Sequence, residues 1–223
     1  MKYKAVIFDM DGVIFDSERL VLECWKEIAQ REGMEHMEEV FRKCIGTNTK
    51  KTKEILLQHY GQEFAYDAFR KEASNLFHSR YDNGRLPMKV GIKELLLYLK
   101  EQGFHIGLAS STRYEVVQKE LQDAGILSYF QSLTCGDMVK QSKPEPEIFL
   151  KACESLSVDA KEAIAIEDSF NGIRSAYRAG MFPIMVPDMI TPNEEMKQLA
   201  GKILNNLIEV KEWIEQEFYK SSS

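Results

Sequence analysis

The chain has 223 residues, of which 44% are hydrophobic and 29% are charged, the composition of a globular protein with a buried core. Its 29 basic and 35 acidic residues give a net charge of −6, which argues against a general nucleic-acid binder or a polybasic membrane binder. The apolar runs are too short to span a bilayer, and no leader-like segment opens the chain. The four cysteines form no CxxC pair and no metal-ligand spacing, so we expect reduced thiols and a cytoplasmic location.

The first predicted element is a short strand, Tyr3–Phe8, which ends in acidic residues and a glycine. From Ser17 to about Asp82 the apolar residues recur at helical spacing, and no strand pattern interrupts them. The clearest predicted helices there are Leu20–Glu32, Lys50–Tyr60 and Ala65–Tyr81. A stretch of this length is too long for a loop and about right for four helices. We therefore predict a helical cap domain, residues 16–85, inserted into a core formed by residues 1–15 and 86–223.

After residue 85 the pattern changes to strands that alternate with helices. The predicted strands are His105–Ala109, Ser132–Cys135, Ala163–Ile166 and Phe182–Val186. The predicted helices are Gly91–Gln102, Thr112–Ala124, Pro146–Leu156, Asn171–Ala179, Asn193–Gly201 and Leu207–Phe218. Thr112, with Glu115 three residues later, matches a capping box at the start of its helix. The alternation predicts a doubly wound, Rossmann-like α/β core: a parallel sheet with helices on both faces.

Acidic side chains follow two of the predicted strands. Asp9 and Asp11 come after the first strand, and Glu167 and Asp168 come after a later one. Since ligands bind beyond the carboxyl ends of parallel strands, we expect these four side chains to share one site. Carboxylates packed together repel one another unless a cation lies among them or some are protonated. Oxygen ligands without histidine or cysteine favour a hard cation such as Mg²⁺.

Other polar residues at the same edge of the sheet fit an anion. Ser110 and Ser111 precede a predicted helix, where they could cap the helix or hold a phosphate with the same N–H groups. Lys143, followed by Pro144, adds a positive charge that could equally be a solvated surface charge. A hard cation, an anion cradle and a lysine around carboxylates are typical of phosphoryl transfer. One of the carboxylates could attack phosphorus and form an aspartyl phosphate.

These segments resemble, in order, the four motifs of the haloacid dehalogenase (HAD) superfamily. The matching segments are Phe8–Val13 with Asp16-Ser17, then Leu108–Ser111, Lys143–Pro146, and Glu167–Ile173 running on to Met181. The resemblance covers essentially the whole chain, and the helical insert is similar to the C1-type cap of subfamily I. Four motifs in the required order are a much stronger signal than any one of them.

The resemblance implies a role for each acidic residue of the first motif. Asp9 would be the nucleophile and also a metal ligand. Asp11 would protonate the leaving oxygen and later activate water, and its backbone carbonyl would bind Mg²⁺. Gly12 would allow the turn that brings the two aspartates together. Because halide needs no proton, an acid at Asp11 argues for phosphate esters and against carbon–halogen bonds.

The resemblance also assigns the residues of the later motifs. Ser110, together with the amide of Ser111, would bind the phosphate. Lys143 would balance the charge of the transferring group and of the nucleophile. Asp168 would bind the metal ion, with Glu167 binding it directly or through water.

The branch that the chain resembles contains both β-phosphoglucomutase and small phosphatases. The mutase pattern has a histidine where this chain has Val21, and an arginine three residues after a glycine in the cap loop Gly46-Thr47-Asn48-Thr49. These differences favour a phosphatase that acts on a small phosphorylated metabolite, a sugar phosphate or a nucleotide or nucleoside monophosphate. A phosphomutase is the alternative. A receiver module, which also uses an aspartate, a hydroxyl and a lysine, lacks a helical cap.

We expect substrate selectivity to lie in Thr47 and Lys50 of the cap, and in Arg113 beside the serine loop. The basic run at residues 42–53 is either a solvated helix face or the partner of a second negative charge on the substrate. We expect a monomer whose partner is the small substrate, with no nucleic acid and no membrane involved.

Overall fold

Six parallel strands form the central sheet, in the order β3-β2-β1-β4-β5-β6. The computed structural model describes residues 2–47 and 49–220. The strands are β1 (Ala5–Phe8), β2 (His105–Ser110), β3 (Ser132–Cys135), β4 (Ala163–Glu167), β5 (Phe182–Met185) and β6 (Lys202–Ile203). From β1 the chain continues to β2 and β3 on one side, then returns to β4 on the other side of β1. The strand order therefore reverses between β1 and β4, which confirms the doubly wound prediction and marks where a ligand binds.

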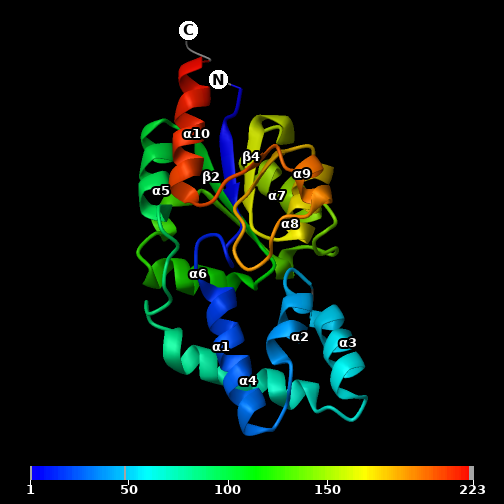
Figure 1. Cartoon of the computed structure of the whole chain (residues 1–223). Helices are drawn as coiled ribbons and strands as arrows, with labels where there is room; N and C mark the ends of the chain where they lie inside the picture. The colour runs from blue at the N-terminus through cyan, green and yellow to red at the C-terminus, as the bar shows by residue number, and fades with distance from the viewer. Residues whose placement is uncertain (1, 48, 221–223) are drawn as a thin grey trace.

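Helices cover both faces of this sheet (Figure 1). Along β1 the side chains alternate: Val6 and Phe8 join the apolar cluster on one face, and Ala5 and Ile7 join the cluster on the other. The first face is covered by α5 (Ile92–Glu101), α6 (Tyr114–Asp123) and α10 (Leu207–Lys220). The second is covered by α7 (Glu147–Ser155) and α8 (Phe170–Arg178), with α9 (Glu194–Leu199) packed beside α8. Burial on both faces explains why β1 and β4 read as unbroken apolar runs.

Four further helices lie at the end of the molecule opposite the chain termini (Figure 1). They are α1 (Ser17–Arg31), α2 (Met37–Cys44), α3 (Thr49–Tyr60) and α4 (Tyr66–Tyr81). They share an apolar cluster of their own, in which the Trp25 ring lies edge-on to Phe41 and Phe69 at 5.0 and 5.2 Å. A separate core of this kind is what a small domain needs to fold. On this basis we propose residues 16–85 as the cap domain.

The capping box predicted at Thr112 is wrong. Helix α6 begins at Tyr114, its N-cap residue is Arg113, and no side chain of that residue caps it. Thr112 therefore lies one residue before the N-cap position, where its oxygen cannot accept from the N–H groups of the first turn. Its hydroxyl donates to Asp11 Oδ2 at 3.0 Å, a charge-assisted hydrogen bond. At the start of α6, the carboxylate of Asp137 accepts a hydrogen bond from the Tyr114 N–H at 3.0 Å.

Two elements escaped the sequence patterns. Helix α2 is only 8 residues long, and β6 is only 2 residues long and pairs with β5 at the edge of the sheet. Such short elements carry too few residues for a periodicity to show. Within residues 2–47 and 49–220, no helix is long and apolar enough to cross a membrane.

Candidate active site

The loop after β1 brings Asp9 and Gly12 against the end of β4. The Asp9 N–H donates to Ile166 O at 2.9 Å, which extends the strand pairing by one residue. Gly12 then turns the chain with φ +77°, and a Cβ atom at this position would lie 2.3 Å from Asp168 Oδ2. Glycine is therefore required here twice, for its backbone conformation and for the close approach of a carboxylate.

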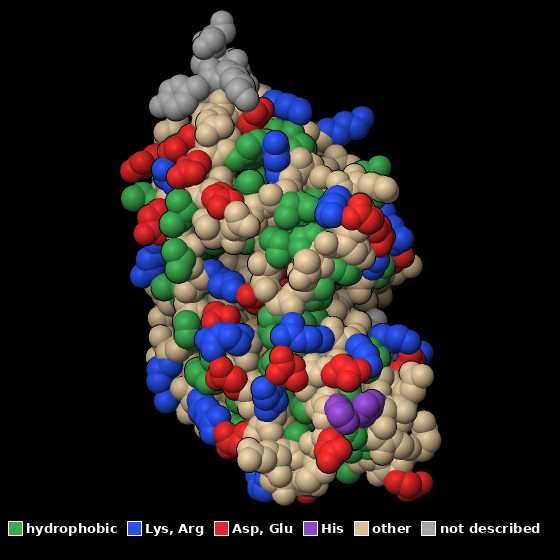
Figure 2. Space-filling model, in the orientation of Figure 1, with side chains coloured by type: hydrophobic (Ala, Val, Ile, Leu, Met, Phe, Trp, Pro, Cys, Tyr) green, Lys and Arg blue, Asp and Glu red, His purple; other side chains and the backbone are tan. Residues whose placement is uncertain are grey.

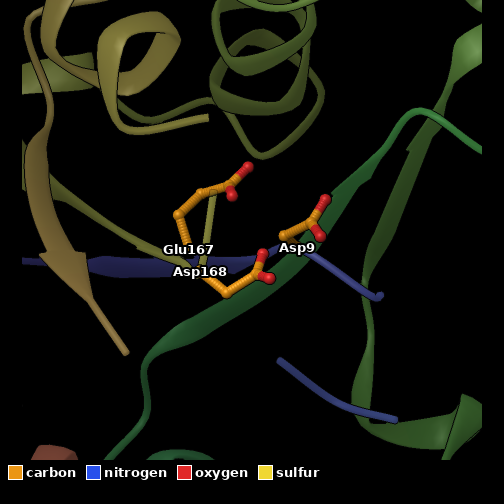
Figure 3. A group of neighbouring side chains, drawn as sticks. All are labelled: Asp9, Glu167 and Asp168. Atoms are coloured by element: carbon orange, nitrogen blue, oxygen red, sulfur yellow. The ribbon is translucent and has the colours of Figure 1, made fainter. Parts of the chain in front are cut away.

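Three buried carboxylates meet where β1 and β4 end. Asp9, Glu167 and Asp168 are 8%, 0% and 3% exposed, and each offers an oxygen within 4.8 Å of the others. Figure 3 shows their carboxyl groups gathered at one place, Asp9 from the end of β1 and the other two from the end of β4. Three acidic groups in so small a volume are stable only with compensating positive charge or with bound protons.

Lys143 supplies one such positive charge. Its Nζ donates to Asp9 Oδ1 at 2.5 Å, to Glu167 Oε1 at 2.5 Å and to Ala109 O at 3.0 Å. The side chain is itself buried, so it is not the solvated surface charge that the sequence left open. All three ammonium hydrogens have acceptors, which fixes the amine between the two carboxylates.

One lysine does not neutralise the group. Burial raises the pKa of Asp9 to about 8; the Lys143 ammonium opposes this, while Glu167 and Asp11 add to it. Burial and neighbouring carboxylates also hold the pKa of Asp168 well above its usual range. Burial tends to lower the pKa of Lys143, but Asp9 and Glu167 outweigh it and raise that pKa. With all its carboxylates ionised, the site would hold more negative charge than Lys143 balances, so it favours bound protons or a bound cation. Its oxygen donors suit a hard divalent ion.

Asp11 lies at the boundary between the core and the cap. Ser17 Oγ, at the start of α1, donates to Asp11 Oδ1 at 2.6 Å, and Thr112 Oγ1 donates to Oδ2 at 3.0 Å. One hydroxyl comes from the cap and the other from the core, so the carboxyl group is oriented by both.

The two serines predicted to bind phosphate are placed differently. Ser110 is fully buried, and its Oγ accepts from the Thr112 N–H at 3.1 Å. Ser111 lines the cavity described below. Its carbonyl packs against Gly136, where a Cβ atom would lie 2.1 Å from Ser111 O. The residue that follows β3 thus packs closely against the loop that contains Ser111.

A cavity of about 370 Å³ lies between cap and core at this site. Its core wall includes Asp9, Asp11, Ser111, Lys143 and Asp168, and its cap wall includes Val21, Phe41, Thr47 and Thr49. Val21 and Thr49, the two positions that differ from the mutase pattern, both face this cavity. Lys50 and Arg113 are exposed and do not belong to its described wall. Asn48, the remaining residue of the predicted cap loop, lies outside the described residues.

Two carboxylates of the site, Glu18 and Asp188, were not predicted from the sequence. Glu18 Oε2 and Asp188 Oδ2 are buried without a hydrogen-bond partner, and with Asp168 they form a second group whose oxygens lie within 4.8 Å. Lys89 Nζ reaches the other oxygen of Asp188 at 2.5 Å. Asp188 follows β5, so the expectation that site residues lie beyond the carboxyl ends of the strands, which identified the other acids, applies to Asp188 as well. Glu18 lies at the start of a cap helix, and the sequence pattern does not show that it turns inward.

The basic run of the cap does not line the cavity. Arg42 pairs with Glu38 at 2.9 Å, and Lys53 pairs with Asp67 at 2.8 Å. Acidic and basic side chains lie interspersed over the face shown in Figure 2. Of the side chains in the described cavity wall, Lys143 is the one cation. The structure therefore favours a solvated helix face over a subsite for a second negative charge.

A cluster of carboxylates and one buried lysine lie beneath the cap, at the point where the strand order of the doubly wound sheet reverses. This arrangement is typical of a phosphoryl-transfer site. The family model of haloacid dehalogenase-like hydrolases matches residues 6–186. The chain therefore belongs to this family, as its motifs indicated, and it is an enzyme of the phosphatase type.

Individual relatives agree with this assignment. The chain is 34% identical to the β-phosphoglucomutase of Bacillus subtilis over 82% of its own length and 83% of that protein. It is 31% identical to the phosphorylated carbohydrates phosphatase of Thermotoga maritima, with 80% and 82% covered. Among solved structures, CbbY from Rhodobacter sphaeroides in complex with phosphate superimposes with a TM-score of 0.77 at 27% identity, covering 93% of this chain and 96% of that one.

Proposed function

We propose that this enzyme is a Mg²⁺-dependent phosphatase that hydrolyses a small phosphorylated metabolite through an aspartyl phosphate on Asp9. The observation that carries the proposal is that Asp9, Asp11 and Lys143 line one cavity between cap and core. The names of relatives that act on phosphorylated carbohydrates favour a sugar phosphate, with a nucleotide or nucleoside monophosphate as the other substrate class. We further propose a cytoplasmic monomer that acts on free metabolites, with no nucleic acid or membrane as partner.

The donor set fits Mg²⁺. The excess negative charge and the unpartnered oxygens of Glu18 and Asp188 are what a hard cation nearby would compensate. Asp9 and Asp168 would hold the ion, with the Asp11 carbonyl, and with Glu167 directly or through water. When bound, the ion neutralises charge on the phosphoryl group and on its carboxylate ligands.

In the first step, Asp9 attacks the phosphorus atom. Lys143 occupies Asp9 Oδ1, which leaves Oδ2 to form the new P–O bond. The bond between phosphorus and the ester oxygen breaks, and that oxygen takes a proton from the Asp11 carboxyl group and leaves as an alcohol. Ser110, the Ser111 amide and Lys143 would hold the phosphoryl oxygens during this transfer.

In the second step, Asp11 has become a carboxylate and can act as a base. It takes a proton from a water molecule whose oxygen attacks the phosphorus atom of the aspartyl phosphate. The bond between phosphorus and Asp9 Oδ2 breaks, so phosphate leaves, and both aspartates return to their starting protonation states. Ser17 and Thr112 hold the Asp11 carboxyl group in place for both proton transfers.

The cavity wall favours hydrolysis over a mutase reaction. A mutase must keep its phosphorylated intermediate bound while the intermediate turns around, which calls for polar contacts on both sides of the cavity. Here Val21 and Phe41 form an apolar part of the cap wall, which supplies no such contacts, and the polar side chains that the cap loop contributes are the uncharged hydroxyls of Thr47 and Thr49.

The test is phosphate release with Mg²⁺ across sugar phosphates, nucleoside monophosphates and small organic phosphates, with Asp9→Asn as the blank. We expect release by the wild-type enzyme and none by the variant. Interconversion of sugar phosphates without phosphate release would replace the phosphatase with a mutase. Equal release by the wild type and by Asp9→Asn would overturn the role of Asp9.

A further inference from the structure

A side chain of the core holds the cap loop at the cavity. Asn171 lies in the first turn of α8, and its Nδ2 donates to Gly46 O at 2.6 Å across 125 residues of sequence. Gly46 is followed by Thr47, and Gly46, Thr47 and Thr49 all line the cavity. The hydrogen bond therefore fixes the position of the loop that contributes part of the cap wall.

The orientation of the Asn171 amide is set by a second contact. Arg174 Nη1 donates to Asn171 Oδ1 at 2.9 Å. Arg174 is itself held by Glu195, which accepts from Nε at 2.7 Å and from Nη2 at 2.5 Å. A flipped amide would place its NH₂ group against the guanidinium and its oxygen against the Gly46 carbonyl, so neither contact could form. The three side chains thus form one chain of contacts from the surface of α9 to the cap loop.

The backbone packs closely at the same point. Gly46 has φ +68°, and a Cβ atom there would lie 3.0 Å from Ser169 Cβ. Ser169 Oγ donates to Glu167 Oε2 at 3.1 Å. The cap loop therefore packs against the residue that donates to Glu167, and a small displacement of the loop changes the shape of the cavity beside it.

We propose that Asn171 is a positioning residue that holds the cap loop at Gly46 in its substrate-binding position, oriented by the Glu195–Arg174 pair. The proposal rests on the proposed function in one respect, that the cavity binds the substrate. Loosening the loop removes contacts to the leaving group that are made equally in the ground state and the transition state, so KM rises more than kcat falls. Since Glu195 lies on the surface, a substitution far from the reacting atoms tests this chain of contacts.

The first experiment measures amide hydrogen exchange of the full-length wild type, Asn171→Asp and Glu195→Gln. Asn171→Asp keeps the size of the side chain, removes the donor and sets two oxygens against each other. We expect exchange in the segment 44–47, where the Thr47 N–H donates to Cys44 O, to become about tenfold faster, the order expected for one lost hydrogen bond. Glu195→Gln is expected to act in the same direction by a smaller factor.

Glu194→Gln is the matched control, because Glu194 is the neighbouring residue on α9 and pairs with Lys197 at 2.6 Å. Its exchange in this segment and its KM are expected to equal those of the wild type. The second measurement is kcat and KM on the best substrate of the panel. We expect KM to rise about fivefold in Asn171→Asp, with kcat within about a factor of two.

Wild-type exchange in both Asn171→Asp and Glu195→Gln would overturn the proposal. Faster exchange with an unchanged KM would also overturn it, since Asn171 would then only stabilise the loop. If the wild type hydrolyses no phosphate ester, the proposed function fails, yet the exchange experiment still decides whether Asn171 holds the loop.

Discussion

Replacing Lys143 by methionine tests whether the buried amine is what stabilises the carboxylates around it. Methionine preserves the approximate length of the side chain and removes three donors. Asp9 and Glu167 then lose their shared partner at 2.5 Å, and Ala109 O loses its donor at 3.0 Å. Removing one partner of a buried ion pair typically costs about 3–5 kcal/mol. A loss of that size is a large part of the stability of an ordinary domain.

The loss is expected to depend on pH in a defined direction. Burial already raises the folded-state pKa of Asp9 to about 8 against the opposing Lys143 ammonium, and without the ammonium it rises further above that of the unfolded chain. Between the unfolded-state pKa and this raised folded-state pKa, the folded protein binds more protons than the unfolded chain. The stability of the variant therefore falls as pH rises through this range. The free energy lost in Lys143→Met is therefore greatest at pH 8 and smaller at pH 5. At pH 8, Mg²⁺ is expected to reduce the difference in unfolding free energy between the wild type and Lys143→Met, because it supplies positive charge to the same carboxylates.

The assay is urea unfolding followed by circular dichroism at pH 5 and pH 8, with and without Mg²⁺. Lys211→Met is the control, because Lys211 pairs with Glu215 at the surface, where both side chains are about 30% exposed, and such pairs contribute about 0–1 kcal/mol. A loss below about 1 kcal/mol for Lys143→Met at pH 8 would refute the reasoning. So would a loss that grows as pH falls.

Three further predictions concern Gly12, Glu120 and Glu18. Gly12→Ala should abolish stabilisation by Mg²⁺ in a thermal shift assay, because its Cβ would lie 2.3 Å from Asp168 Oδ2. Gly103→Ala is the control: Gly103 has φ +75° and no atom within 4 Å of an added Cβ, so this variant should lose only about 1–2 kcal/mol of folding stability through its backbone conformation. Glu120→Gln should stabilise the protein at pH 8.5 by on the order of 1 kcal/mol and less at pH 5, because burial raises the pKa of Glu120 to about 8 and the charged form opposes folding above the unfolded pKa. Glu18→Gln should raise the melting temperature of the metal-free protein at pH 8, because burial and, to a smaller extent, nearby carboxylates hold the pKa of Glu18 well above its usual range. Urea unfolding of Glu120→Gln and thermal unfolding of Glu18→Gln measure these effects. A stability below that of the wild type in either variant would contradict its prediction.

The sequence predicted most of the acidic residues that the structure brings together, because the relevant signals are local. An unbroken apolar run followed by acids identifies a buried parallel strand and its carboxyl end, and this pattern located Asp9 and Asp168 without any contact information. The same locality explains the error at Thr112. A capping box is read from four consecutive residues, whereas the Thr112 hydroxyl donates to the carboxylate of Asp11 at 3.0 Å, 101 positions away in the chain.

By itself, therefore, the sequence determined the fold class, the helical insert and the acids at the strand ends, since periodicity and strand-end chemistry depend on neighbouring residues alone. Only the tertiary structure decided which groups meet across the molecule. It brought Glu18 of the cap and Asp188 of the core to the same cluster, and it set the amide of Asn171 against the Gly46 carbonyl. These contacts depend on how the cap packs on the core, and packing of side chains far apart in the chain leaves no periodic trace in the sequence.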